Sequence, residues 1–231
     1  MKNTILIILL FFGALTLQAQ PKENWDQEKL TGQRYAYHEQ LRGSPFLFDD
    51  WINGSVTLVS GEVIENVPLK YNAYLDELIT YNPVYFTVIK LDKYTLHRFE
   101  FDLFGEHWLF EKRFFPGFPK GDRFFRILHE GQTDLLCYYK VNLLNTSPYK
   151  DQNDVLKNQE FFSGYRYFLF QPESDFTSVQ LRKKSLLRCV KKDDLKQARQ
   201  LIRKGNLELK DVGGFSSGMQ LFEENKIELK F

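Results

Sequence analysis

One stretch of the sequence matches the G-x-S-x-G pattern of a hydrolase nucleophile elbow: Gly214-Phe215-Ser216-Ser217-Gly218. Such an elbow needs a strand before the serine, a helix after it, and an acid and a histidine further along the chain. The last histidine of this chain is His129, so no histidine follows Ser216. The sequence therefore predicts no hydrolase triad. We interpret the stretch as a glycine-rich loop that leads into a short helix at 219–222.

Histidine is the side chain that most often exchanges protons or binds metal near neutral pH. Zinc sites need several His or Cys ligands at short spacings, and neither H-x-H nor H-E-x-x-H occurs in this chain. We therefore expect structural or exposed histidines and no metal site. The four histidines are His38, His97, His107 and His129.

Three pairs of identical acidic residues are adjacent in the chain: Asp49-Asp50, Asp193-Asp194 and Glu223-Glu224. Neighbouring residues of a strand point to opposite faces, so such a pair cannot by itself supply the two facing carboxylates of a glycosidase. Two distant carboxylates can still meet in space. An enzyme with a site assembled from distant residues therefore stays open as an alternative.

Cys137 and Cys189 are the only cysteines. An oxidising compartment permits a disulfide between them, which would close a loop of about 50 residues and add roughly 4 kcal/mol in the chain-entropy model. Both positions have apolar surroundings in the sequence, so two separately buried thiols are the alternative.

The composition points to a sheet protein without a strong overall charge. Among 231 residues there are 22 Phe, 12 Tyr and 3 Trp, and this aromatic content suits a pleated, half-buried sheet surface. Lys and Arg number 31 against 30 Asp and Glu, which gives a formal charge of +1. This overall charge gives no electrostatic reason to expect binding to nucleic acid or to an anionic membrane, so we expect no nucleic-acid partner.

The first 19 residues have the three parts of a secretory signal peptide. Met1-Lys2-Asn3 is a basic start, Ile5–Leu15 is apolar, and Leu17-Gln18-Ala19 offers a small residue at the cleavage point. The apolar stretch covers only about half of a ~30 Å hydrocarbon core. After cleavage the longest apolar run is Leu135–Tyr139, so we expect no transmembrane segment and an exported protein, periplasmic or secreted.

Turn signals then divide the chain into short strands. Residues 20–43 are polar with sparse apolar anchors, and we interpret them as a lead-in that is partly helical. Asn53-Gly54 predicts a hairpin turn between strands at 46–52 and 55–59. Ser60-Gly61 predicts the next turn.

The clearest strand is 97–103, in which Phe99, Phe101 and Leu103 alternate with charged residues. A two-residue turn at Gly105-Glu106 would place Leu103 opposite Trp108, Phe101 opposite Phe110 and Glu100 opposite Glu111. These cross-strand partners predict one apolar and one solvated face.

Further hairpin strands are expected at 124–129 and 135–141, the second of them central because both of its faces are apolar. Residues 145–159, which include Pro148, read as a polar loop. Strands at 165–170 and 179–181 complete the sheet.

The apolar period changes to that of a helix after Ser185. Leu195, Ala198, Leu201 and Ile202 fall on one face of a helix that begins near Asp193-Asp194 and ends before Gly205. We expect this helix to dock as a lid on the aromatic face of the sheet. The predicted fold is mainly β (α+β): an antiparallel meander, curved or half-barrel, in a single domain at 44–231 with helices at about 185–204 packed on one face.

Several stretches together carry a resemblance: Gly43–Trp51, Val67–Leu78, Leu128–Gly131 and Lys183–Leu187. They are similar to stretches of uncharacterised signal-peptide proteins from Bacteroidota-type bacteria. The resemblance implies a periplasmic or cell-envelope location and strands followed by helices. It implies no activity and no site residues.

These observations predict an exported cell-envelope protein that is a non-catalytic binding or structural module. We expect no catalytic, cofactor-binding or metal-binding residue and no cofactor. The expected partner is an envelope protein or an apolar small molecule. The alternatives are a periplasmic carrier of an apolar ligand and, behind it, the enzyme with a site assembled from distant residues.

Overall fold

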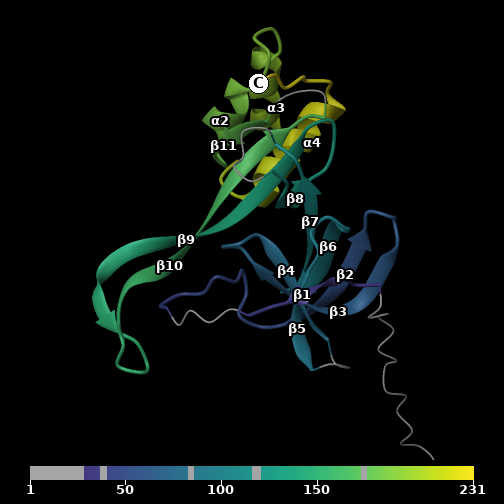
Figure 1. Ribbon diagram of the computed structural model, residues 1–231. Helices are drawn as coiled ribbons and strands as arrows, with labels where there is room; N and C mark the ends of the chain where they lie inside the picture. Colours follow the sequence, from purple (N-terminus) through teal and green to yellow (C-terminus); the bar gives the residue numbers. More distant parts are fainter. Residues whose placement is uncertain (1–28, 37–40, 83–85, 116–120, 173–175) are drawn as a thin grey trace, which may run out of the picture.

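The computed structural model shows a mainly β protein with an open antiparallel sheet of eleven strands and three C-terminal helices (Figure 1). The predicted fold class is therefore confirmed. The predicted signal peptide and most of the lead-in lie outside the described residues. The structure describes residues 29–36, 41–82, 86–115, 121–172 and 176–231.

Neighbouring strands pair in the order β1-β5-β4-β3-β2-β6-β7-β8-β9-β10-β11. The strands are β1 Gly32–Arg34, β2 Ile52–Leu58, β3 Val63–Asn72, β4 Glu77–Asn82, β5 Thr87–Leu91, β6 Leu96–Leu103, β7 Glu106–Arg113, β8 Arg123–His129, β9 Asp134–Lys150, β10 Leu156–Phe170 and β11 Phe176–Val179. The helices are α2 Lys183–Arg188, α3 Leu195–Lys204 and α4 Val212–Glu224. Of the described residues of the lead-in, 32–34 form the edge strand β1.

The two predicted glycine turns have different outcomes. Ser60-Gly61 connects β2 to β3, and Gly61 has the positive φ of +88° that favours glycine. Asn53-Gly54 is not a turn, because both residues lie inside β2 between β3 and β6. A Cβ on Gly54 would lie 2.2 Å from the Glu100 carbonyl oxygen of β6. This glycine therefore permits the close approach of a neighbouring strand at a bulge.

The hairpin of β6 and β7 forms as predicted but with its register shifted by two residues. Its turn is Phe104-Gly105, and both residues have positive φ. Phe101 therefore lies opposite Trp108, and Arg98 lies opposite Glu111. A shift of two keeps the same side chains on the same face. It also replaces the predicted pair of like charges by a pair of opposite charges.

The polar segment 145–159 is strand over most of its length, so the prediction of a loop was wrong. β9 and β10 pair with each other from Asp134 and Phe170 out to Lys150 and Leu156. The outer half of this hairpin leaves the body of the sheet as an arm (Figure 1). We call residues 142–162 the arm. Many of its side chains on both faces are exposed to solvent. The segment therefore lacks the alternation of apolar and polar residues by which a half-buried strand is recognised in a sequence.

The largest core lies between β2, β3, β6, β7 and β8 and is rich in aromatic rings; we call it the aromatic core. The rings of Phe99 and Phe110 are fully buried and stack with centroids 4.7 Å apart. Phe124 meets Phe99 edge-on at 5.1 Å. Phe48 and Leu47, from the segment before β2, pack against the same cluster.

A second core joins the three helices to the sheet; we call this region the helical end. Leu135, Leu169 and Val179 contribute the sheet side of the cluster. α4 packs against β8, whereas α3 packs on α2 and α4. The predicted docking on the aromatic face was wrong, because Ala198 and Ile202 of α3 belong to this second core, whose buried sheet residues are aliphatic.

Candidate binding groove

An open groove of about 530 Å³ lies between the segment 43–49 and the β9–β10 hairpin. Its volume lies within the ~300–1,000 Å³ range of small-molecule sites. Tyr165 is 61% exposed at the groove, so part of its lining is free to contact a ligand. The aromatic side chains that line the groove are Phe46, Phe48, Tyr139, Phe161 and Tyr165.

The segment before the groove is fastened to the arm through Arg42. The Phe161 backbone N–H donates to the Arg42 carbonyl at 2.8 Å, and the Arg42 backbone N–H donates to Tyr149 Oη at 2.9 Å. The guanidinium of Arg42 also lies 4.1 Å from the centre of the Tyr149 ring. A Cβ on Gly43, whose φ is +77°, would lie 2.4 Å from the Phe161 carbonyl oxygen. These contacts fix one wall of the groove.

Behind the groove a stack of rings ends on a cation. Trp108 contacts Phe48 edge-on at 5.2 Å and stacks with Tyr139 at 5.9 Å. The Arg126 guanidinium lies 3.4 Å from the Trp108 ring centre and pairs with Glu106 at 3.0 Å. The Trp108 Nε1–H is buried and has no acceptor among the described residues. These contacts support the rings that face the groove.

Two phenols beside the groove, those of Tyr139 and Tyr167, have raised pKa values. Burial, with a smaller contribution from Cys137, raises the pKa of Tyr139 to about 12. Burial also raises the pKa of Tyr167, which lies beside Tyr165. Neutral tyrosines can donate hydrogen bonds while their rings stack on an apolar or planar ligand.

One edge of β10 is open beside the groove. β11 pairs with β10 at 167–170, and Arg42 reaches it at Phe161, so no described strand covers the edge at 162–166. The Phe161 N–H points away from β9, and alternation along a strand gives Ser163 and Tyr165 the same direction. Their backbone N–H and C=O groups are therefore available to an added strand.

Most of the residues that suggested chemistry in the sequence lie outside the lining of this groove. Ser216 lies inside α4, and its hydroxyl donates to the Leu128 carbonyl at 3.4 Å. The predicted glycine-rich loop was wrong, because α4 already begins at Val212. Gly214 and Gly218 allow close packing: a Cβ would lie 1.9 Å from the Glu208 carbonyl oxygen at the first and 2.7 Å from a Leu209 methyl at the second.

Two of the described histidines have carboxylate neighbours. His129 Nε2 lies 3.7 Å from Glu223 at the helical end. His107 Nδ1 lies 3.0 Å from Asp102 and Nε2 lies 3.5 Å from Glu100, on an exposed face. Ser55 Oγ donates to Glu100 at 2.9 Å and not to the histidine, so the order of contacts is not that of a catalytic triad. Within the described residues, no three His, Cys or acidic side chains are placed to hold a metal ion.

The two thiols are buried and free, so the disulfide alternative does not hold in this structure. Burial raises the pKa of Cys137 to about 12 and also raises that of Cys189. Thiols of this kind are poor nucleophiles at neutral pH because little thiolate is present.

Sequence reasoning also missed a buried carboxylate, Asp76, which is 2% exposed at the turn between β3 and β4. It accepts from Tyr71 Oη at 2.5 Å and from Arg123 at 3.0 Å, and it pairs with Lys93. Burial, and then the Asp76 charge, raises the pKa of Tyr71 well above its usual value. These partners satisfy the carboxylate, so we interpret the cluster as structural.

No protein-family model, curated protein or solved structure matches the chain. Among the helices of the described residues, none has both the length and the apolar character needed to cross a bilayer. The proposed function therefore rests on the geometry of the groove.

Proposed function

We propose that this chain is an exported cell-envelope protein that acts as a non-catalytic binding module. In this proposal its ligand is an extended segment of another envelope protein. The observation that carries the proposal is the open edge of β10 at Ser163–Tyr165, which lies directly in an aromatic groove. An extended peptide can add to such an edge through backbone hydrogen bonds while alternate side chains enter the neighbouring groove.

The groove favours a partner with apolar or aromatic side chains. Its five aromatic residues come from segments far apart in the sequence, at 46–48 and 139–165, and Arg42 fastens these segments together. Preorganised rings of this kind lower the entropy cost of binding. The signal-peptide pattern supports a partner in the envelope.

A matched pair of substitutions tests the strand-addition part of the proposal. Ser163→Pro removes an N–H that faces away from β9, so it should abolish partner binding and leave the urea midpoint near that of the wild type. Ser163→Ala keeps the N–H and should still bind. Phe162→Pro should instead destabilise the hairpin, because that N–H faces β9. A strongly lowered midpoint in Ser163→Pro would contradict our assignment of the edge.

Cross-linking in the cells that make the protein identifies the chemical class of the ligand. A benzophenone amino acid in place of Tyr165 should cross-link to a polypeptide, and this adduct should disappear with Ser163→Pro and persist with Ser163→Ala. The same probe at Tyr94, which is 87% exposed and outside the groove, is the control. Equal adducts at both positions, or none at position 165, would contradict the proposal.

The second candidate function is a carrier of an apolar ligand, which the volume and aromatic lining of the groove favour. A lipid or small-molecule adduct at position 165, or bound lipid in a native mass spectrum, would select this candidate. Export has its own test. Protein recovered from the periplasm or medium should begin at Gln20, and an intact Met1 on cytoplasmic protein would contradict export.

A further inference from the structure

One segment of this near-neutral chain, made of two helices and their connection, carries a strong net positive charge. Residues 182–204, which form α2, α3 and their connection, contain ten Lys and Arg against two Asp, Asp193 and Asp194. This segment therefore has a formal charge of +8, and the rest of the chain has −7, which together make the +1 of the whole sequence. The near-zero charge of the whole chain is thus the sum of a basic segment and an acidic remainder.

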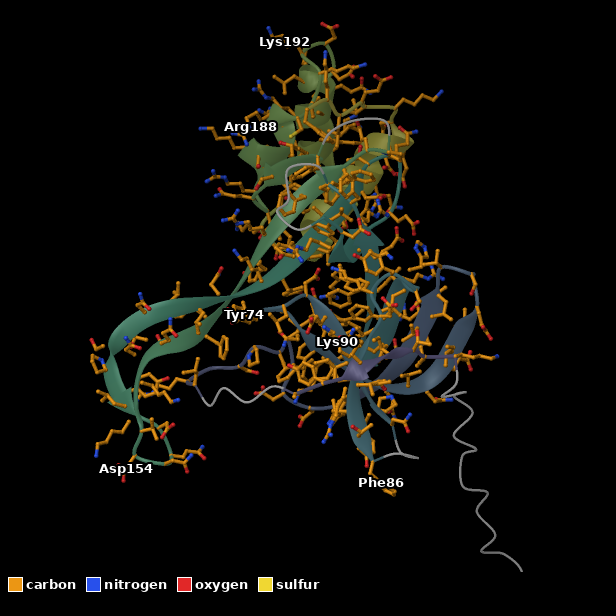
Figure 2. The ribbon with its side chains drawn as sticks, in the orientation of Figure 1. Tyr74, Phe86, Lys90, Asp154, Arg188 and Lys192 are labelled. Carbon is orange, nitrogen blue, oxygen red and sulfur yellow. The ribbon has the colours of Figure 1, made fainter. Side chains whose placement is uncertain are left out.

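All ten basic side chains of this segment are exposed, and Lys191 is the one that forms an ion pair with a described residue, Glu228. Figure 2 labels Arg188 and Lys192 at the helical end, where side-chain nitrogens point outward around the helices. We call the basic residues of 182–204 the basic face. They are Arg182, Lys183, Lys184, Arg188, Lys191, Lys192, Lys196, Arg199, Arg203 and Lys204.

On α3 the spacing of the basic residues places like charges next to one another, which destabilises the helix by itself. Lys196, Arg199 and Arg203 lie three and four residues apart, and like charges at these spacings repel. Within the described residues, none of the three has an acidic partner. An anionic surface that approaches the face would relieve this repulsion.

We propose that the basic face docks the protein on a bilayer of anionic phospholipids. Lys and Arg near such a surface each contribute an attraction of about 1 kcal/mol. The segment 182–204 contains no Phe, Tyr or Trp, so it offers neither an aromatic anchor for insertion nor a stacking platform for single-stranded nucleic acid. The docking is therefore peripheral and sensitive to salt.

The position of the face suits a membrane-docked binding module. The helices occupy one end of the molecule, and the arm and the body of the sheet extend away from them (Figures 1 and 2). Docking through the helical end leaves the groove open to a partner. The choice of a membrane over nucleic acid rests on the proposed export of the chain.

Sedimentation of the chain from Gln20 onward with vesicles tests the docking. At low salt it should bind vesicles of equal parts phosphatidylglycerol and phosphatidylcholine, and it should not bind vesicles of phosphatidylcholine alone. The triple variant Lys196→Gln, Arg199→Gln, Arg203→Gln should bind about 100-fold more weakly. Salt near 1 M should release the wild type, since the screening length is then about 3 Å.

The control variant removes three exposed charges elsewhere: Arg34→Gln, Lys150→Gln and Arg166→Gln. It should bind the anionic vesicles nearly as the wild type does. An equal loss of vesicle binding in both triple variants would contradict the proposal that the basic face makes the contact. Equal binding of the wild type to neutral and anionic vesicles would contradict electrostatic docking. Tighter binding to a DNA duplex than to the vesicles would assign the face to a different partner. The Gln20 test and the Ser163 variants are independent of these results.

Discussion

The aromatic core and the helical end share one continuous sheet but bury different kinds of side chain. In the aromatic core, Phe99, Phe110 and Phe124 pack ring on ring between strands. At the helical end, Leu135 and Leu169 of the sheet meet aliphatic and small residues of the helices, with Phe215 and Phe222 as the buried rings of α4. The core between strands is therefore richer in aromatic rings, and the core between helices and sheet is richer in aliphatic groups.

The two regions also differ in charge. The basic face belongs to the helical end, and the remainder of the chain is acidic overall. The groove and the open edge of β10 lie between the aromatic core and the arm, away from this face (Figure 1). Binding of a partner and docking on a membrane can therefore be changed separately, as the Ser163 and triple variants are designed to show.

The largest effect on stability is expected in the aromatic core. Phe99→Ala should lower the free energy of unfolding by about 3–5 kcal/mol, because it removes a fully buried ring that stacks on Phe110. Urea unfolding followed by near-UV circular dichroism measures the change. Phe99→Leu, which conserves most of the volume, should cost much less. A small effect of Phe99→Ala would mean that the ring stack does not support the sheet.

A smaller effect is expected at the helical end. Ile202→Ala should lower the free energy of unfolding by about 2–5 kcal/mol, because Ile202 is 2% exposed. Leu201→Ala should cost less, since Leu201 is only half-buried, and Lys196→Ala should stay within about ±0.5 kcal/mol. Far-UV circular dichroism against urea gives the midpoints. Equal midpoints for Ile202→Ala and Lys196→Ala would mean that α3 is not docked.

The pH dependence sharpens the comparison, because Tyr71 belongs to the aromatic core. Its raised pKa means that the folded chain keeps the phenol proton at pH values where the unfolded chain has released it. The free energy of unfolding therefore falls as pH rises above about 10. Tyr71→Phe cannot titrate and should show a shallower fall between pH 8 and pH 11. It should also be less stable at neutral pH by about 1.5–3 kcal/mol, through the lost hydrogen bond to Asp76. An unchanged fall would exclude Tyr71 as the titrating group.

Local patterns predicted those parts of the fold that local physics decides. The alternation at 97–103 gave β6 within one residue, and Ser60-Gly61 gave a turn because glycine adopts the required positive φ. The spacing of Ala198 and Ile202 gave the buried side of α3. The absence of a histidine after Ser216 was enough to reject a hydrolase elbow. In each case the physical reason for the local structure lies within a few neighbouring residues.

The candidate site was beyond such reasoning because long-range contacts create it. The groove forms where 43–49 meets 139–165, and the open edge of β10 exists only because β11 is short. The sequence did indicate a protein rich in exposed or half-buried aromatic residues. It did not indicate which rings would share a surface.

The sequence by itself determined the mainly β class, the helical C-terminal segment and the lack of familiar catalytic patterns. Tertiary structure decided that Asn53-Gly54 lies inside a strand, because β3 and β6 flank it and only a glycine admits the Glu100 carbonyl. It also decided that 145–159 is part of the arm, because two strands that pair with each other away from the core need no apolar alternation. In both cases the deciding contacts come from residues distant in the chain, and a local pattern contains no information about them.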